Sequence, residues 1–139
     1  MRFSKLLALI LAVCLLGTLM VACDSGNKTE ETTAEAATSV TISVTLIIKD
    51  ASGAEVANEA VYYTGTNPTL GEIIETYCAI MDYPEAFNDL GLLATIGELA
   101  PSSGKHWIAY YETQGKGNAF DSIMNQPVAD GQTVVVAID

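Results

Sequence analysis

The clearest pattern in the chain is an alternation of apolar and polar side chains between Val40 and Lys49. A period of two places successive side chains on opposite faces of a strand, and this run is rich in β-branched residues, which strands favour. Asp50 to Gly53 has the composition of a turn. We therefore expect a second strand within Val56 to Thr64, paired back onto the first as a hairpin.

The pattern then changes to a helical period. Thr69 is followed three residues later by Glu72, which is a capping-box sequence, in which each side chain satisfies a backbone N–H at the start of a helix. The apolar residues that follow have helical spacing and predict one buried stripe: Leu70, Ile73, Ile74, Tyr77, Cys78 and Met81. Cys78 is expected to be a small buried hydrophobe on this stripe.

The second half of the domain predicts a short turn of helix at Glu85 to Leu90 and three strands. The strands are expected at Leu92 to Leu99, His106 to Thr113 and Thr133 to Ile138. The last is almost wholly apolar, which favours a central position buried on both faces. The helix must cover one face of the sheet, and a right-handed crossover places the last strand beside the first. The pattern predicts an α+β fold, a β-grasp-like mixed sheet packed on one main helix.

The first 22 residues have the layout of an export signal. Arg2 and Lys5 flank the start of an apolar run that is short for a membrane-spanning helix, and the run leads through Ala22 to Cys23. This arrangement resembles the bacterial lipobox, whose cysteine receives a diacylglycerol. We predict a signal peptide at 1–22 and lipidation of Cys23, which would hold an extracytoplasmic protein on the bacterial cell membrane. An uncleaved anchor and an ordinary secretory signal are the alternatives.

Residues 23–39 contain no aromatic or large aliphatic side chain and predict a flexible tether. Residues 40–139 have the length of one domain. Without Arg2 and Lys5, four basic residues remain against 17 acidic ones, so the processed chain has a net charge of −13. Such a surface repels phosphate backbones and anionic headgroups. We therefore expect no nucleic-acid partner, and membrane contact through the lipid anchor alone.

Four segments carry a family likeness, and they occur in order along the domain: Thr69 to Glu75, Ala94 to Leu99, Lys105 to Tyr111 and Pro127 to Val134. The third contains a Trp-x-x-Tyr pattern. Together they resemble the transcobalamin-like C-terminal domain family, and the likeness covers nearly all of residues 40–139. The resemblance implies a β-grasp-type fold. In animal vitamin B12 carriers a similar domain closes over the corrin ring together with a helical domain, so the resemblance also implies a corrinoid or a similar small planar ligand.

The aromatic strand and the loop after it provide the candidate ligand-binding residues, which are His106, Trp107, Tyr110, Tyr111 and Asn118. Alternation places Trp107 and Tyr111 on one face of the strand, with His106 and Tyr110 on the other. One pair is expected in the core, and an exposed pair beside the loop could stack on a planar ligand. His106 is the only histidine. It could ligate cobalt, but one histidine makes a poor metal site, and a half-exposed strand residue is the alternative.

The loop from Gln114 to Gln126 offers oxygen atoms for calcium at Asn118, Asp121 and Asn125, but their spacing matches no EF-hand loop. We predict no metal site and no cofactor. The chain has no nucleophile elbow, no phosphate-binding glycine loop and no second histidine for a triad, so we predict that it is not an enzyme. Two functions stay open. One is a lipid-anchored ligand-binding module, and the alternative is a surface adhesion module that recognises a protein or glycan.

Overall fold

A computed structural model describes residues 36–139, so the expected signal peptide, Cys23 and most of the expected tether lie outside the described residues. The predicted hairpin is confirmed, with β1 (Val40–Lys49) antiparallel to β2 (Glu55–Gly65). Its turn is organised by Asp50, whose Oδ1 accepts hydrogen bonds from the backbone N–H of Ser52 at 2.8 Å and of Ala54 at 3.1 Å. The hydrogen bond from the Ser52 hydroxyl, and then these backbone bonds, lower the pKa of the Asp50 carboxyl.

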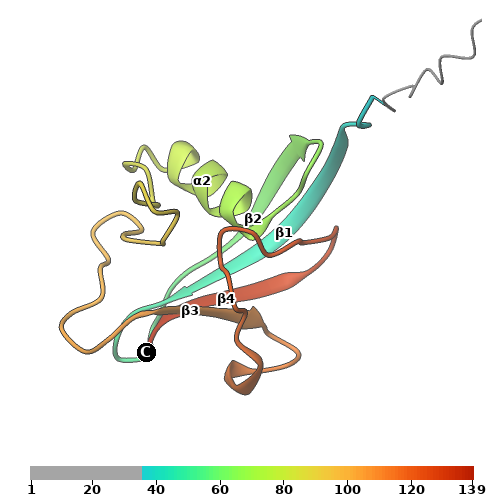
Figure 1. The fold of residues 1–139 in the computed structure, drawn as a ribbon. Coiled ribbons are helices and arrows are strands. Elements are labelled where there is room, and N and C mark those ends of the chain that lie inside the picture. The colour runs from blue at the N-terminus through green and yellow to red at the C-terminus, as the bar shows by residue number, and fades with distance from the viewer. Residues whose placement is uncertain (1–35) are drawn as a thin grey trace, which may run out of the picture. The chain divides into compact units, whose positions relative to one another are not determined.

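The sheet has four strands in the order β2-β1-β4-β3 (Figure 1). The last strand, β4 (Thr133–Ile138), lies parallel to β1, and β3 (Trp107–Tyr111) pairs antiparallel with β4. The prediction that the last strand lies beside the first is therefore confirmed. Every residue of β4 after Thr133 is buried, as its continuous apolar sequence predicts for a central strand. The fold is α+β, with a β-grasp-like mixed sheet.

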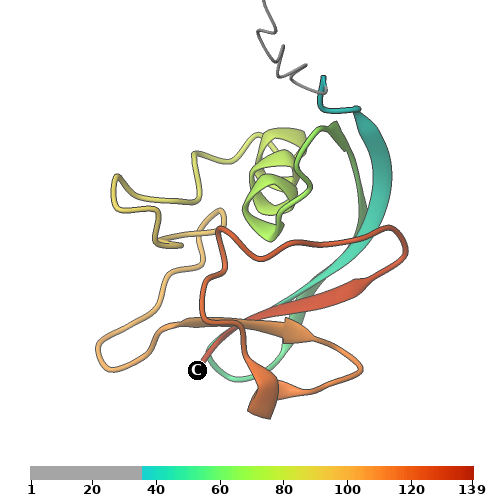
Figure 2. The ribbon, with the colours of Figure 1, turned by 45° about the vertical axis from the view of Figure 1, so that its right-hand side comes forward.

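One helix, α2 (Leu70–Ile80), lies on one face of this sheet (Figures 1 and 2). Half of the predicted capping box is present, because Thr69 Oγ1 accepts a hydrogen bond from the Glu72 N–H at 3.3 Å. The first helical N–H groups donate instead to a distant loop: that of Leu70 to the Gln126 carbonyl at 2.7 Å, and that of Gly71 to the Met124 carbonyl at 3.2 Å. A Cβ atom at Gly71 would lie 2.6 Å from that Met124 oxygen, so this contact requires glycine.

The core lies between α2 and the sheet. Five of the six predicted stripe residues are buried there: Leu70, Ile73, Ile74, Tyr77 and Cys78. The prediction for Met81 is wrong, because its side chain is 44% exposed. The helix ends at Ile80, so Met81 is its C-cap residue at the end of the stripe, and the chain turns at the next residue, Asp82, whose φ is 57°.

The segment between α2 and β3 corrects two further predictions. No helical turn forms at Glu85 to Leu90, because the N–H groups of Ala86 and Phe87 donate to a carboxylate oxygen of Glu75, at 3.0 and 3.3 Å. No strand forms at Leu92 to Leu99 either. Ile96 and Leu99 exchange two backbone hydrogen bonds of 3.0 Å across a tight turn, which Gly97 permits with a φ of 60°.

The predicted aromatic strand exists but is shorter than expected. It ends at Tyr111 rather than Thr113, because the Tyr111 carbonyl accepts hydrogen bonds from the N–H groups of Gln114 and Gly115 and so closes a turn. The short 3₁₀ helix η1 (Lys116–Asn118) follows this turn. Within residues 36–139, no helix has the length and apolar character needed to cross a membrane.

Candidate functional site

Strand β3 divides the aromatic candidates between two environments. Trp107 and Tyr111 face α2, as alternation predicts, and Trp107 is only 8% exposed. The Trp107 indole N–H donates to the Ala94 carbonyl at 3.1 Å. The Tyr111 hydroxyl donates to the Pro127 carbonyl, also at 3.1 Å. Both polar groups are thus hydrogen-bonded to backbone carbonyls of neighbouring loops. The main role of these two residues is therefore packing in or against the core.

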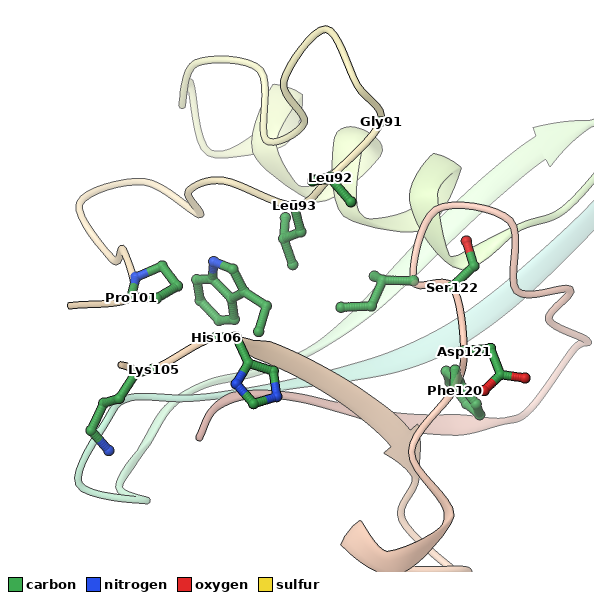
Figure 3. A pocket seen from close by; sticks show the side chains of 11 residues that line it. Gly91, Leu92, Leu93, Pro101, Lys105, His106, Phe120, Asp121 and Ser122 are labelled. Carbon is green, nitrogen blue, oxygen red and sulfur yellow. The ribbon is translucent and has the colours of Figure 1, made fainter. Parts of the chain in front are cut away.

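A cleft opens beside the start of β3, and we call it the His106 cleft. Its volume is about 380 Å³. Four parts of the chain line it: residues 91–93, Pro101, residues 105–107 and residues 120–123. Figure 3 shows Leu92 and Leu93 on one side, Lys105 and His106 at one end, and Phe120 to Ser122 at the other. Side chains far apart in the sequence therefore converge on one concave surface.

The wall of the His106 cleft is apolar and continuous with the core. Leu93, Phe120 and Ile123 are half-buried and pack against the core cluster, and one side of the wall is Trp107. Phe120 stacks edge-on against Tyr111 with ring centroids 4.8 Å apart, and its N–H donates to the Ala109 carbonyl at 2.8 Å. These contacts fix the loop to β3, so the wall is held in place by packing.

The rim of the His106 cleft is polar. Lys105, His106, Asp121 and Ser122 are all exposed and line it. The cleft thus combines one apolar wall with basic, acidic and hydroxyl groups at its mouth. Such a surface can bind an amphipathic molecule, with its apolar part against the wall and its polar groups at the rim.

The structure does not bring all five candidate residues together. His106 and Trp107 line the His106 cleft, whereas Tyr110 lies on the other sheet face, in a separate hollow of about 290 Å³. Asn118 is exposed in η1, and its side-chain amide donates to the Gln114 carbonyl at 2.9 Å. Sequence reasoning missed Phe120 and Ile123. Their signal was present, because Phe120, Ile123 and Met124 are large apolar residues in a loop that is otherwise polar or small.

Within residues 36–139 no metal-binding cluster is present, and the thiol of Cys78 is not activated. Residues 36–139 contain no group of three or more His, Cys, Asp or Glu side chains placed to hold a metal ion. His106 can supply one ligand only. Cys78 is buried, as predicted. Burial, and then the charge of Glu75, raise the pKa of the Cys78 thiol to about 11, so the thiol is protonated at neutral pH and is a poor nucleophile.

Comparisons with known proteins add a distant structural likeness. No family model matches the chain, and neither does any curated protein sequence. One similar crystal structure is that of a "putative metal binding protein" from Ruminococcus gnavus ATCC 29149. It aligns with 16% identity over 70% of this chain and 96% of that chain, with a TM-score of 0.49. A likeness at this level carries no function to this chain.

Proposed function

We propose that this chain is a lipid-anchored, extracytoplasmic and non-catalytic module that binds a small amphipathic ligand in the His106 cleft. A corrinoid or a similar small planar molecule is the leading candidate. The observation that supports the proposal is the composition of the cleft, in which an apolar wall containing Trp107 and Phe120 meets a polar rim containing His106. The compartment rests on the export signal and on Cys23.

The dimensions of the cleft define how a ligand would lie. A volume of about 380 Å³ falls in the lower part of the range of small-molecule pockets, which is roughly 300 to 1,000 Å³. A molecule as large as a corrinoid would therefore place one edge against the wall and leave its remainder at the surface. His106 lies at the mouth of the cleft, where a neutral imidazole could reach a metal carried by the ligand.

Calorimetric titration of the full chain in a nonionic detergent, with cyanocobalamin and then hydroxocobalamin, tests the proposal. We expect micromolar binding, with preference for the hydroxo form because its axial position is exchangeable. His106→Ala should remove that preference. Ser122→Tyr should weaken both titrations by filling the cleft, whereas Ser102→Tyr places the same side chain outside the cleft and serves as the matched control.

Absence of heat from micromolar to millimolar corrinoid would contradict the corrinoid assignment. The alternative is then adhesion to a protein or glycan. It is supported by the exposed apolar side chains at the end of α2, where Ile80 is 67% and Met81 is 44% exposed. Exposed apolar groups that gather on one surface are typical of protein contacts.

A further inference from the structure

The charges of the folded domain are distributed unevenly. Residues 40–139 contain 13 acidic side chains and only three lysines, so their net charge is −10. All three lysines nevertheless line the hollow that contains Tyr110, which we call the lysine hollow. The one carboxylate side chain that lines it is that of Asp139. The hollow is therefore a positive site on a negative domain.

The three lysines reach the lysine hollow from separate elements. Lys49 is the last residue of β1, Lys105 precedes β3, and Lys116 begins η1. The Lys105 ammonium donates to the Ala51 carbonyl at 3.2 Å, and Lys116 forms an ion pair with Asp139. The fold thus gathers and orients charges that are far apart in the sequence.

The behaviour of Asp139 reports the local electrostatic potential. Its carboxyl pKa is lowered, first by the hydrogen bond from Lys116 and then by the charges of Lys116, His106 and Lys105. Lys105 and Lys116 therefore both act on one carboxylate at this end of the sheet. Asp50 follows Lys49 in the sequence, but its carboxylate accepts hydrogen bonds from Ser52 within the hairpin turn and does not line the lysine hollow.

The floor of the lysine hollow is apolar. It includes Ile108, Tyr110 and Ala137, which pack with Ile47 and Val135 on the sheet face opposite the core. Tyr110 is half-buried, and its ring provides a flat surface beside the lysines. A charged wall next to an aromatic floor favours a ligand with both features.

From these observations we infer that the lysine hollow is a second binding site, for an anionic ligand with a flat apolar body. A carboxylate or phosphate group would accept charge-assisted hydrogen bonds from the lysines, and the apolar body would lie on Tyr110. The site is separate from the His106 cleft, although Lys105 lines both. Because the lysines are close to solvent, added salt weakens this binding.

Calorimetric titration of the full chain in a nonionic detergent, with 2-naphthyl phosphate, tests the site. We expect sub-millimolar binding that weakens with salt, and much weaker binding of 2-naphthol and of inorganic phosphate, each of which has only one of the two features. Lys49→Gln and Lys116→Gln should each weaken the binding of 2-naphthyl phosphate about tenfold, the factor that corresponds to one lost charge-assisted contact. Lys28→Gln removes the same charge from residues 23–39 and should change it less than about twofold.

Two further variants locate the probe. Tyr110→Leu should weaken the binding of 2-naphthyl phosphate, whereas Tyr62→Leu, at a 69% exposed tyrosine outside the hollow, should leave it unchanged. Ser122→Tyr fills the His106 cleft and should also leave it unchanged, so failure of the first proposed site does not count against the second. Equal losses in Lys28→Gln and Lys49→Gln, loss in Ser122→Tyr, binding of 2-naphthol as tight as that of its phosphate, or no binding at millimolar concentration would each overturn the inference.

Discussion

The two faces of the sheet use the same strands for different purposes. Toward α2, the strands bury one large cluster that also includes residues from the irregular segments, such as Ala86, Ile96 and Val128. On the opposite face only Ile47, Val135 and Ala137 are buried, with Ile108 and Tyr110 packed against them. No α-helix within residues 36–139 covers this second face. The comparison separates a face that holds the fold together from a face that is available to bind.

The difference also explains where the charges lie. A charged group on the face toward α2 would need a partner in the core, and no buried polar or charged residue is present in the described part of the chain. The opposite face remains in contact with water, so lysines can gather there without a large desolvation cost. Alternation within each strand therefore supplies the core on one face and the apolar floor of the lysine hollow on the other. The lysines themselves come from the end of β1 and from the segments on either side of β3.

The largest effect on stability that tests this comparison is expected from truncating two adjacent isoleucines of β1 to alanine. Ile48 belongs to the main core and Ile47 to the small cluster on the other face. Ile48→Ala should lower the free energy of unfolding by about 2–5 kcal/mol, the usual cost of emptying a packed site. Ile47→Ala should cost less, about 2 kcal/mol, at the lower end of this range, because only a small cluster surrounds the side chain.

Urea unfolding of the two variants beside the wild type measures this difference. The substitution is chemically the same in both, and both side chains are nearly inaccessible, at 1% for Ile48 and 5% for Ile47. Equal losses of stability would mean that the two sheet faces contribute equally to the stability of the fold. The proposed distinction between a stabilising face and a binding face would then be wrong.

The regular elements were predictable because their side-chain periods repeat over many residues. The β1 alternation, the stripe on α2 and the apolar β4 gave the sheet, the helix and the parallel pairing. The segment between α2 and β3 was not predictable in the same way. Its shape depends on the single carboxylate of Glu75, which accepts hydrogen bonds from two backbone N–H groups, and no local pattern encodes such a contact.

The candidate sites were predictable only in part, for a related reason. The aromatic pattern of β3 identified His106, Trp107, Tyr110 and Tyr111 as candidate binding residues, and alternation assigned Trp107 and Tyr111 to one face without deciding which face is buried. The partners of these residues come from other segments, such as Phe120 in the His106 cleft and Lys116 in the lysine hollow. Convergence of this kind is set by the tertiary fold, so the sequence pattern of β3 alone does not contain it.

A second, smaller effect on stability should appear in alkaline solution, where the buried thiol of Cys78 on the core face titrates. The folded pKa of Cys78 is about 11, above the ordinary value of 9.0, because burial disfavours the thiolate. The native state therefore keeps a proton that the unfolded chain loses first. This contribution to stability is complete below pH 9 and disappears as the pH rises toward 11, a loss of roughly 2 kcal/mol.

Comparison of wild type and Cys78→Ala across this pH range isolates the thiol. The variant loses some packing at every pH, but its stability should fall less steeply between pH 9 and 11. Tyr77 also has a pKa raised, first of all, by burial, and this part of its shift is common to both proteins and cancels in the difference. The smaller part that the Cys78 thiolate causes is removed together with the thiol. Parallel stability curves would show that the thiol is not held in the core as described.

The smallest expected effect compares two adjacent tyrosines of β2, Tyr62 and Tyr63, which alternation sends to opposite faces. Tyr63 packs against the main core, whereas Tyr62 is 69% exposed. Tyr63→Ala should cost about 1 kcal/mol of stability through lost apolar contact, and Tyr62→Ala less than about 0.5 kcal/mol, as is usual for surface substitutions. Thermal unfolding of both variants measures the pair. A loss of stability at Tyr62 as large as that at Tyr63 would imply that the sheet face opposite α2 also stabilises the fold near Tyr62. The distinction between a stabilising face and a binding face would then hold only near the lysine hollow.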